Sequence, residues 1–312
     1  MALHELKFPS HNGRDQIHAW IWAPAATPRG IVQIVHGLAE HSRRYHHLIT
    51  ALLDAGFIVA ADDHAGHGAT AAESGVWLDT GENGADAVIV DERTLHDLVT
   101  DLYPGLPHIM FGHSWGTVIA RSYAARHGSS LAALVLSGPA SQLKGTERTL
   151  DRDALAAALA DGDGTAPGPE FQAQLFDGFV DRFGPDAGPT DWVASDPGVI
   201  ADHAADPLNN VTTPMSLRFM QDFVTLYDDI TADAWAQSIS TDLPVLILAG
   251  DQDPVCNYGE GALHIANRLW ETGTTDVTTR LFPGARHEVH NEPDHRQDFE
   301  ATVVDFLDRV AG

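Results

Sequence analysis

The chain of 312 residues is long enough to bury a complete hydrophobic core, and its apolar content of 44% is typical of a globular protein. Its formal net charge is −26, because 32 Asp and 12 Glu stand against 16 Arg and only 2 Lys. Such an acidic surface repels polyanions, which argues against nucleic acid or an anionic membrane as a partner.

Strand and helix patterns alternate along most of the chain. The segments 3–10 and 17–24 predict an antiparallel pair of strands joined by the turn HNGRD. Further strands are predicted from apolar runs at 30–37, 57–62, 108–112, 131–138, 243–250 and 276–284. Apolar residues at helical spacing predict helices over 45–53, 85–103, 115–127 and 299–310. This order predicts an α/β fold, with a mostly parallel eight-stranded sheet flanked by helices.

Residues 140–238 interrupt the alternation with Pro- and Gly-rich segments and helix-like pieces. We therefore expect a helical cap inserted between a first core part, 1–139, and a second core part, 239–312. Within the cap, the apolar spacing over 175–183 predicts one shared helix face. Some cap aromatics are expected to line a cavity between cap and sheet, although most should pack within the cap itself.

The segment IMFGHSWGTVIA, residues 109–120, contains a G-x-S-x-G pattern centred on Ser114. The pattern alone is weak, but here it follows a predicted strand and opens a predicted helix. That setting is typical of a nucleophile elbow, in which a sharp turn exposes the serine at the carboxyl edge of the sheet. Ser114 is therefore the candidate nucleophile.

A serine hydroxyl becomes a strong nucleophile when a base removes its proton and a third group orients that base. After one late strand, GDQDPVCN offers Asp251 and Asp253, and after the next, PGARHEVHNE offers His287 and His290. We favour Asp253 as the acid, since Asp251 is placed to stabilise the turn leaving the strand. We favour His287 as the base and expect His290 to pack or hydrogen-bond on the surface.

Stabilising the developing oxyanion requires two backbone N–H donors. The amide of Trp115, directly after the nucleophile, is one candidate. The other is Leu38, in the HGLAEH loop that follows the 30–37 strand. The Trp115 ring itself is expected to serve packing rather than chemistry.

Five segments resemble, in order, the successive signatures of α/β-hydrolases: HGLAEHSRRY (36–45), DHAGHG (63–68), GHSWG (112–116), GDQDPVCNYG (250–259) and PGARHEVHNE (283–292). They are most similar to the monoacylglycerol lipase and lysophospholipase group, also described as serine aminopeptidase-like. The similarity covers almost the whole chain, and the insertion resembles the cap of that group. It implies the same roles as above, for the triad of Ser114, Asp253 and His287 and for the amides of Leu38 and Trp115.

The chain departs from that group at two positions. Trp115 stands where the group usually has Met, and Ala39 stands where it usually has Gly. Neither change removes a backbone donor, but both add bulk that would narrow the acyl pocket. The resemblance therefore does not decide whether the pocket accepts long acyl chains.

Metal and cofactor chemistry is not expected. HEVHN resembles the zinc pattern H-E-x-x-H, but Asn291 occupies the position of the second ligand. The histidines of the loops near Ser114 are interpreted as hydrogen-bonding residues that stabilise those loops, namely His36, His41, His64 and His67. Cys256 is expected to be a small packing residue, and as the lone cysteine it excludes an internal disulfide.

Three functions of different classes remain open from the sequence. The first is a cofactor-free esterase that cleaves a small acyl ester, such as a monoacylglycerol or lysophospholipid, through an acyl-enzyme. The second is an aminopeptidase or amidase that uses the same triad, and the third is a non-catalytic binding protein on this scaffold. The N-terminus lacks a signal pattern and no segment is apolar enough to span a membrane, so we expect a cytoplasmic protein. Nothing in the sequence indicates an oligomeric state.

Overall fold

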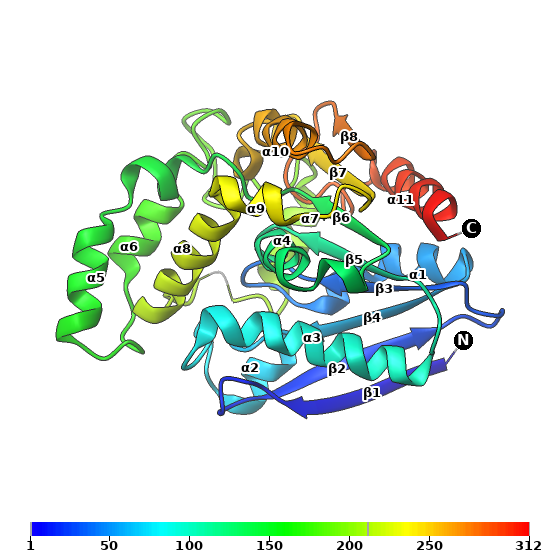
Figure 1. The fold of residues 1–312 in the computed structure, drawn as a ribbon. Helices are drawn as coiled ribbons and strands as arrows, with labels where there is room; N and C mark the ends of the chain where they lie inside the picture. The colour runs from blue at the N-terminus through cyan, green and yellow to red at the C-terminus, as the bar shows by residue number, and fades with distance from the viewer. Residues whose placement is uncertain (1, 211, 312) are drawn as a thin grey trace.

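A computed structural model describes residues 2–210 and 212–311 of the chain. Its centre is a single sheet in the order β1-β2-β4-β3-β5-β6-β7-β8 (Figure 1). The strands are β1 (Ala2–Pro9), β2 (Gln16–Ala23), β3 (Gly30–Val35), β4 (Phe57–Asp63), β5 (His108–His113), β6 (Ala133–Ser137), β7 (Val245–Gly250) and β8 (Val277–Phe282). All eight strands coincide with the predicted segments to within a few residues. The predicted α/β fold is confirmed.

The sheet is antiparallel at one edge and parallel elsewhere. β2 pairs antiparallel with both β1 and β4, and every pair from β4 to β8 is parallel. The inner strands β3 to β7 are buried throughout, which explains why they read as continuous apolar runs. Because these strands are parallel, the loops at their carboxyl ends meet at one edge of the sheet.

Helices cover both faces of the sheet. The core helices are α1 (His46–Asp54), α2 (Gly68–Ser74), α3 (Gly84–Leu102), α4 (Trp115–His127), α10 (Glu260–Glu271) and α11 (Arg296–Ala311). Apolar side chains of α1 and α11 pack together against one face. Side chains of α3, α4 and α10 pack against the other face. The result is the three-layered arrangement that the alternating pattern predicts.

Between β6 and β7 the described residues contain helices and no strand of the main sheet. These helices are α5 (Arg152–Asp161), α6 (Pro169–Leu175), α7 (Pro197–Ala205), α8 (Leu217–Thr231) and α9 (Asp233–Ser238). Figure 1 shows α5, α6 and α8 projecting beside the sheet. The division into core parts 1–139 and 239–312 around a cap at 140–238 stays our interpretation.

The prediction of one helix face over 175–183 is wrong. α6 ends at Leu175, and residues 176–183 form a series of turns. Gly178 within them has a φ of +90°, a left-handed conformation that stops a helix and that glycine adopts without steric cost. The turns still bury Phe179, so the helical spacing of the apolar residues over 175–183 reflects their burial and not a helix.

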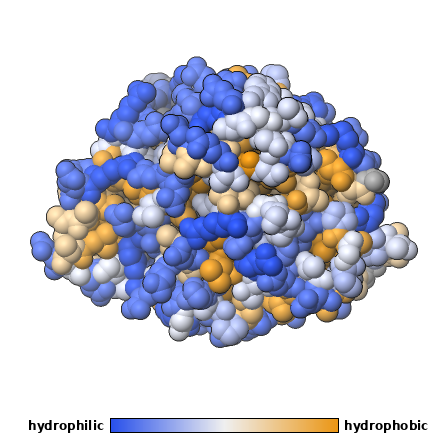
Figure 2. All heavy atoms as spheres, viewed as in Figure 1, coloured by the Kyte–Doolittle hydropathy of each residue, from blue (hydrophilic) through white to orange (hydrophobic). Residues whose placement is uncertain are grey.

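The surface seen in Figure 2 is largely hydrophilic, with apolar residues at the end where α5 lies and in separate patches elsewhere on this face. No helix in the described part of the chain is both long and apolar enough to cross a lipid bilayer. The cytoplasmic location stays a prediction from the sequence.

The start of α4 lies unusually close to the end of β3. A Cβ on Gly116 would lie 2.1 Å from the carbonyl oxygen of Val35, and one on Gly112 would lie 2.5 Å from the carbonyl oxygen of Gly116. Because only hydrogen fits at these two positions, β5 can turn directly into α4 above the neighbouring strand. The approach fixes the turn that carries Ser114.

Replacing Gly116 with Ala should therefore push α4 away from β3. We expect Gly116→Ala to lower the free energy of unfolding by about 3 kcal/mol or more, since backbone atoms cannot yield as a side chain can. Gly128 is the matched control, because it ends the same helix at a φ of −55° with no atom near its added Cβ. Gly128→Ala should stay within about 1 kcal/mol of the parent in denaturant unfolding. Equal stability of the two variants would contradict the packing argument.

Candidate active site

Ser114 occupies the strained turn between β5 and α4. Its φ and ψ are 55° and −123°, which only a few non-glycine residues adopt. Its backbone N–H donates to the carbonyl of Ser137 at 3.0 Å, and its own carbonyl accepts from the N–H and hydroxyl of Thr117 at 2.8 and 2.6 Å. These bonds hold a half-buried side chain at the carboxyl edge of the sheet.

Asp253 and His287 lie in the loops after β7 and β8 and contact each other. His287 Nδ1 is 2.9 Å from Asp253 Oδ2. The other carboxylate oxygen of Asp253 accepts the N–H of Val255 at 2.8 Å, so both oxygens of this fully buried group are occupied. This geometry fixes the ring orientation of His287 and leaves its Nε2 without a protein partner.

Asp251, the alternative acid, lies elsewhere in the same loop. Its Oδ1 accepts from the N–H of Gly284 at 2.8 Å and from Gln252 Nε2 at 3.0 Å. It therefore ties together the loops that follow β7 and β8. That is the turn-stabilising role the sequence suggested for it.

His290 packs, as one of the two expected alternatives, but the surface location expected for it is wrong. His290 is buried and stacks on Tyr45, with ring centroids 4.8 Å apart and planes 6° apart. Burial lowers the pKa of His290 to about 3, so the ring is neutral and packs like an aromatic residue. The sequence could not show this, because Tyr45 is remote in the chain.

Two opposing effects act on the pKa of His287. Burial lowers the pKa, and the Asp253 carboxylate, through its charge and its hydrogen bond, raises it by more, so the net pKa lies above the usual value. Gly138 leaves room for the ring, since a Cβ there would lie 3.0 Å from His287 Nδ1 and Cε1. The site therefore holds an imidazole that accepts a proton more readily than a free one.

The loop after β3 approaches Ser114 closely. A Cβ on Gly37 would lie 3.0 Å from the Cβ of Ser114, and the N–H of Gly37 donates to Glu40 Oε1 at 2.5 Å. Ala39 has a φ of +58°, the left-handed region in which the family's usual glycine is strain-free. Leu38, between them, is half-buried and lines the same cavity as Ser114.

Trp115 is the first residue of α4, so its N–H has no acceptor within the helix. Its ring is buried and stacks on His67 at 5.1 Å between centroids, with Phe219 at 5.2 Å. The ring thus packs against the core and the cap, as expected, while the amide remains available at the helix N-terminus.

A buried charge cluster that the sequence reasoning missed links the two loops beside Ser114. Arg44 Nη2 is 2.6 Å from Glu288 Oε2, and Arg44 Nε is 3.3 Å from Glu40 Oε2. Burial, with the charge of Glu288, raises the pKa of Glu40 to about 7. Burial also acts to raise the pKa of Glu288, but the charge of Arg44 outweighs this effect, and the net pKa of Glu288 is lowered to about 2. Glu40 and Arg44, four residues apart in HGLAEHSRRY, were the available signal.

The loop histidines have hydrogen-bonding partners. His36 Nδ1 is 2.8 Å from the carbonyl oxygen of Gly37, and His41 Nε2 is 2.9 Å from Asp206 of the cap. Cys256 is fully buried, and burial raises the pKa of its thiol well above the usual value, which keeps the thiol protonated and inert.

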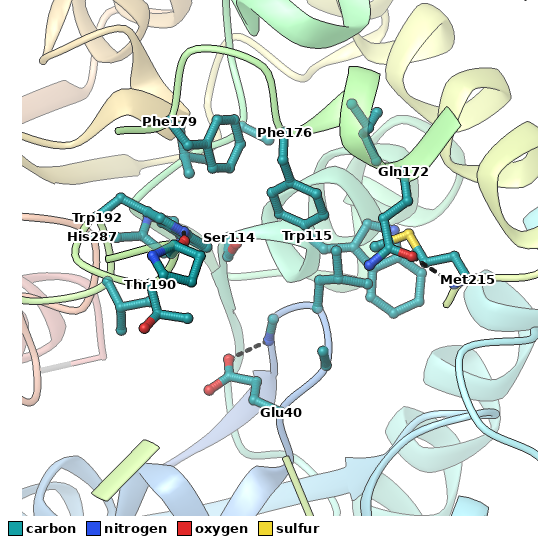
Figure 3. A pocket seen from close by; sticks show the side chains of 18 of the residues that line it. Glu40, Ser114, Trp115, Gln172, Phe176, Phe179, Thr190, Trp192, Met215 and His287 are labelled. Carbon is teal, nitrogen blue, oxygen red and sulfur yellow. Dashed lines mark hydrogen bonds between the residues drawn. The ribbon is translucent and has the colours of Figure 1, made fainter. Parts of the chain in front are cut away.

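Ser114 and His287 open into one cavity of about 530 Å³ (Figure 3). Its walls are mostly apolar and come from both the core loops and the cap. They include Leu78, Leu143, Leu175, Phe176, Phe179, Trp192, Val193, Met215, Phe223 and Val255. In Figure 3, Trp192 lies beside His287, whereas Met215 lies beyond Trp115 on the opposite side of Ser114. The cavity can hold an elongated apolar molecule across the serine.

Comparison with known proteins adds independent observations. The family model for serine aminopeptidase, S33, matches residues 26–294. A monoacylglycerol lipase of Mycolicibacterium smegmatis is 30% identical over 291 residues, covering 92% of each chain. A solved lipase in an open form superposes with a TM-score of 0.96 at 50% identity, and a thermostable carboxyl esterase of Bacillus coagulans in complex with glycerol gives 0.96 at 43%. Both structures and the chain cover one another completely.

The contact between Asp253 and His287 can be tested by titration. In protein labelled with ¹⁵N-histidine, the pKa of His287 measured by NMR should lie above about 6.5. Asp253→Asn removes the charge that raises the pKa and leaves the burial that lowers it, so the value should fall below about 6.5. Asp251→Asn, in the same loop, should leave it unchanged. A larger change from Asp251→Asn than from Asp253→Asn would contradict the pairing.

Proposed function

Because the chain belongs to the serine aminopeptidase S33 family of α/β-hydrolases, we propose that it hydrolyses lipid esters of the monoacylglycerol or lysophospholipid type through a catalytic triad. The chain is a carboxylic ester hydrolase of the monoacylglycerol lipase type. The observation that carries the finer proposal is that His287, which is paired with Asp253, lines the same cavity as Ser114. No cofactor enters the mechanism.

In the first half-reaction, Ser114 Oγ attacks the ester carbonyl while His287 Nε2 takes the hydroxyl proton. Asp253 holds the imidazole through Nδ1 and stabilises the imidazolium that forms. The amides of Leu38 and Trp115 donate to the oxyanion. The intermediate collapses as His287 returns the proton to the departing alcohol oxygen, which leaves an acyl-enzyme on Ser114.

In the second half-reaction, the oxygen of a water molecule attacks the acyl carbonyl while His287 removes a proton from that water. The same two amides stabilise the second oxyanion. Collapse of this intermediate returns the proton to Ser114 Oγ and releases the carboxylic acid. The enzyme is restored with no net change in its own protons.

Proton transfer also orients the substrate. The alcohol oxygen must come within reach of His287 Nε2, so the alcohol occupies the side of the cavity where Trp192 lies. The acyl chain then extends the opposite way, past Trp115 toward Met215. Gln172 lies on that side, where its Oε1 accepts the N–H of Met215 at 2.8 Å. The mostly apolar lining of the cavity as a whole supports a lipid acyl group over a polar one.

The lining also favours an ester over a peptide. An aminopeptidase would need carboxylates from the cap to hold the substrate amine. Among the described residues that line the cavity, the only carboxylates are Glu40 and Glu288, which belong to core loops and are engaged with Arg44. The cap at 140–238 instead contributes mainly apolar side chains, which supports its interpretation as a substrate-covering domain between the two core parts.

The nucleophile is tested by substitution and labelling. Ser114→Ala should lower kcat on a medium-chain acyl ester by about 10⁴-fold or more, because the acyl-enzyme cannot form. A fluorophosphonate probe, mapped by peptide mass spectrometry, should modify Ser114. Ser122 is a buried serine on α4, the helix that follows Ser114, and Ser122→Ala should keep both activity and labelling. Modification of another residue, or activity retained in Ser114→Ala, would contradict the proposed role.

The substrate class and its orientation are tested with a series of esters and aminoacyl amides. We expect medium or longer acyl esters to be preferred over acetyl esters and amides in kcat/KM. Met215→Trp should shorten the acyl side and lower kcat/KM for long esters by about tenfold, while acetyl esters change little. Met215→Ala is the matched variant and should keep the parent's kcat/KM for long esters. A preference for amides would instead support the peptidase, and an equal loss at every chain length would refute the assigned acyl side.

A further inference from the structure

A second cluster of ionisable side chains lies outside the triad, under the loop that carries Leu38. Asp62 is the second-last residue of β4, His64 directly follows the strand, and Glu92 comes from α3. All three are buried, with exposed fractions of 0%, 3% and 0%. One ligand atom from each lies within 4.8 Å of the others, which is close enough for a single cation to contact all three.

The distances between these atoms suit a small ion better than hydrogen bonds. His64 Nδ1 lies 3.3 Å from Glu92 Oε1 and 3.4 Å from Asp62 Oδ2. Charge-assisted hydrogen bonds are usually shorter, at about 2.7–2.9 Å. Nitrogen and oxygen ligands about 2.0–2.1 Å from a tetrahedral zinc ion, by contrast, are about 3.3–3.4 Å apart.

Two buried carboxylate oxygen atoms in the cluster have no hydrogen-bond donor among the described residues, although one of them lies within ion-pair distance of His64. Glu92 Oε1, on the His64 side, and Asp62 Oδ1 accept no hydrogen bond in the described structure. His64 has one Nδ1 and can offer one proton between the two carboxylates. Two buried carboxylates in contact are costly unless a positive charge compensates them.

Neighbouring groups already orient the ligands as a second layer around a metal would. His64 Nε2 lies 3.3 Å from the carbonyl oxygen of His36, an arrangement that places the proton on Nε2 and the lone pair on Nδ1. Gln33 Nε2 donates to Glu92 Oε2 at 2.6 Å and is held in turn by His108, whose Nε2 lies 3.0 Å from Gln33 Oε1. Glu92 is therefore fixed through one oxygen, and its other oxygen faces His64.

We propose that Asp62, His64 and Glu92 bind a zinc ion that stabilises the fold beneath the active site. The unpartnered Asp62 Oδ1 can complete a fourth contact by making that carboxylate bidentate. The N–H of His64 donates to His36 Nε2 at 3.1 Å, and the two rings stack at 3.8 Å. An ion that fixed His64 would thereby fix the residue that precedes Gly37, so its role is structural and outside the ester chemistry.

The test is metal content rather than activity. The full chain is produced with zinc in the medium, washed with a chelator to remove surface-bound metal from its other histidines, and analysed by elemental mass spectrometry. We expect about one zinc ion per chain in the parent and less than about one tenth in Glu92→Gln and Asp62→Asn. Asp91→Asn is the matched control, since Asp91 is also buried on α3 but binds Ser10 and His11 instead. It should retain the metal.

Thermal unfolding supplies the second readout. Refolding with added zinc should raise the Tm of the parent by several degrees relative to refolding with chelator. The Tm of Glu92→Gln should be the same with zinc as with chelator. If the parent retains no zinc and its Tm does not rise with zinc, the proposal is overturned, and Asp62 and Glu92 instead share a proton. Zinc retained equally in Glu92→Gln would also overturn it, because the ion would then be held elsewhere. Neither readout depends on the triad.

Discussion

The active site depends on one close backbone contact, between the first turn of α4 and the last residues of β3. Gly116 lies so near the Val35 carbonyl that no side chain fits between them. That approach forces Ser114 into its left-handed turn and brings it against Gly37, the start of the loop that carries Leu38. Nucleophile and candidate oxyanion donor are thus aligned by the same packing event, and parallel pairing brings the loops after β7 and β8 to the same edge.

Around this contact, hydrogen bonds and ion pairs under the cap connect loops whose positions the sheet alone would not fix relative to one another. Arg44 joins Glu40 of one loop to Glu288 of another, and the cap adds a hydrogen bond from the Glu288 N–H to the Val193 carbonyl at 2.8 Å. His41 contacts the cap at Asp206. Polar groups therefore surround the apolar cavity, and the two carboxylates of Glu40 and Glu288 share the guanidinium of Arg44. This arrangement lets a hydrophobic substrate bind without loosening the groups that react with it.

Local patterns made much of the fold predictable. Buried strands, the helices between them and the elbow at Ser114 are encoded by neighbours in the chain, and the sequence order of acid and base narrowed each to two residues. What depends on distant partners was missed: His290 is buried by Tyr45, and Glu40, Arg44 and Glu288 meet only in three dimensions. Over 176–183 the apolar spacing predicts a helix where the structure has turns, because burial of Phe179 in turns produces the same spacing. The sequence already favours Asp253 over Asp251, but the contact with His287 that supports this preference forms only in three dimensions.

The most direct test is a crystal structure of the chain inhibited by an alkylphosphonate, whose tetrahedral phosphorus mimics the intermediate of ester cleavage. The phosphorus should be bonded to Ser114 Oγ, with its free oxygen about 2.7–3.1 Å from the amide nitrogens of both Leu38 and Trp115. His287 Nε2 should face the leaving-group side, and the alkyl chain should run toward Met215. A phosphonate oxygen turned away from both amides, or His287 separated from both the adduct and Asp253, would contradict the account.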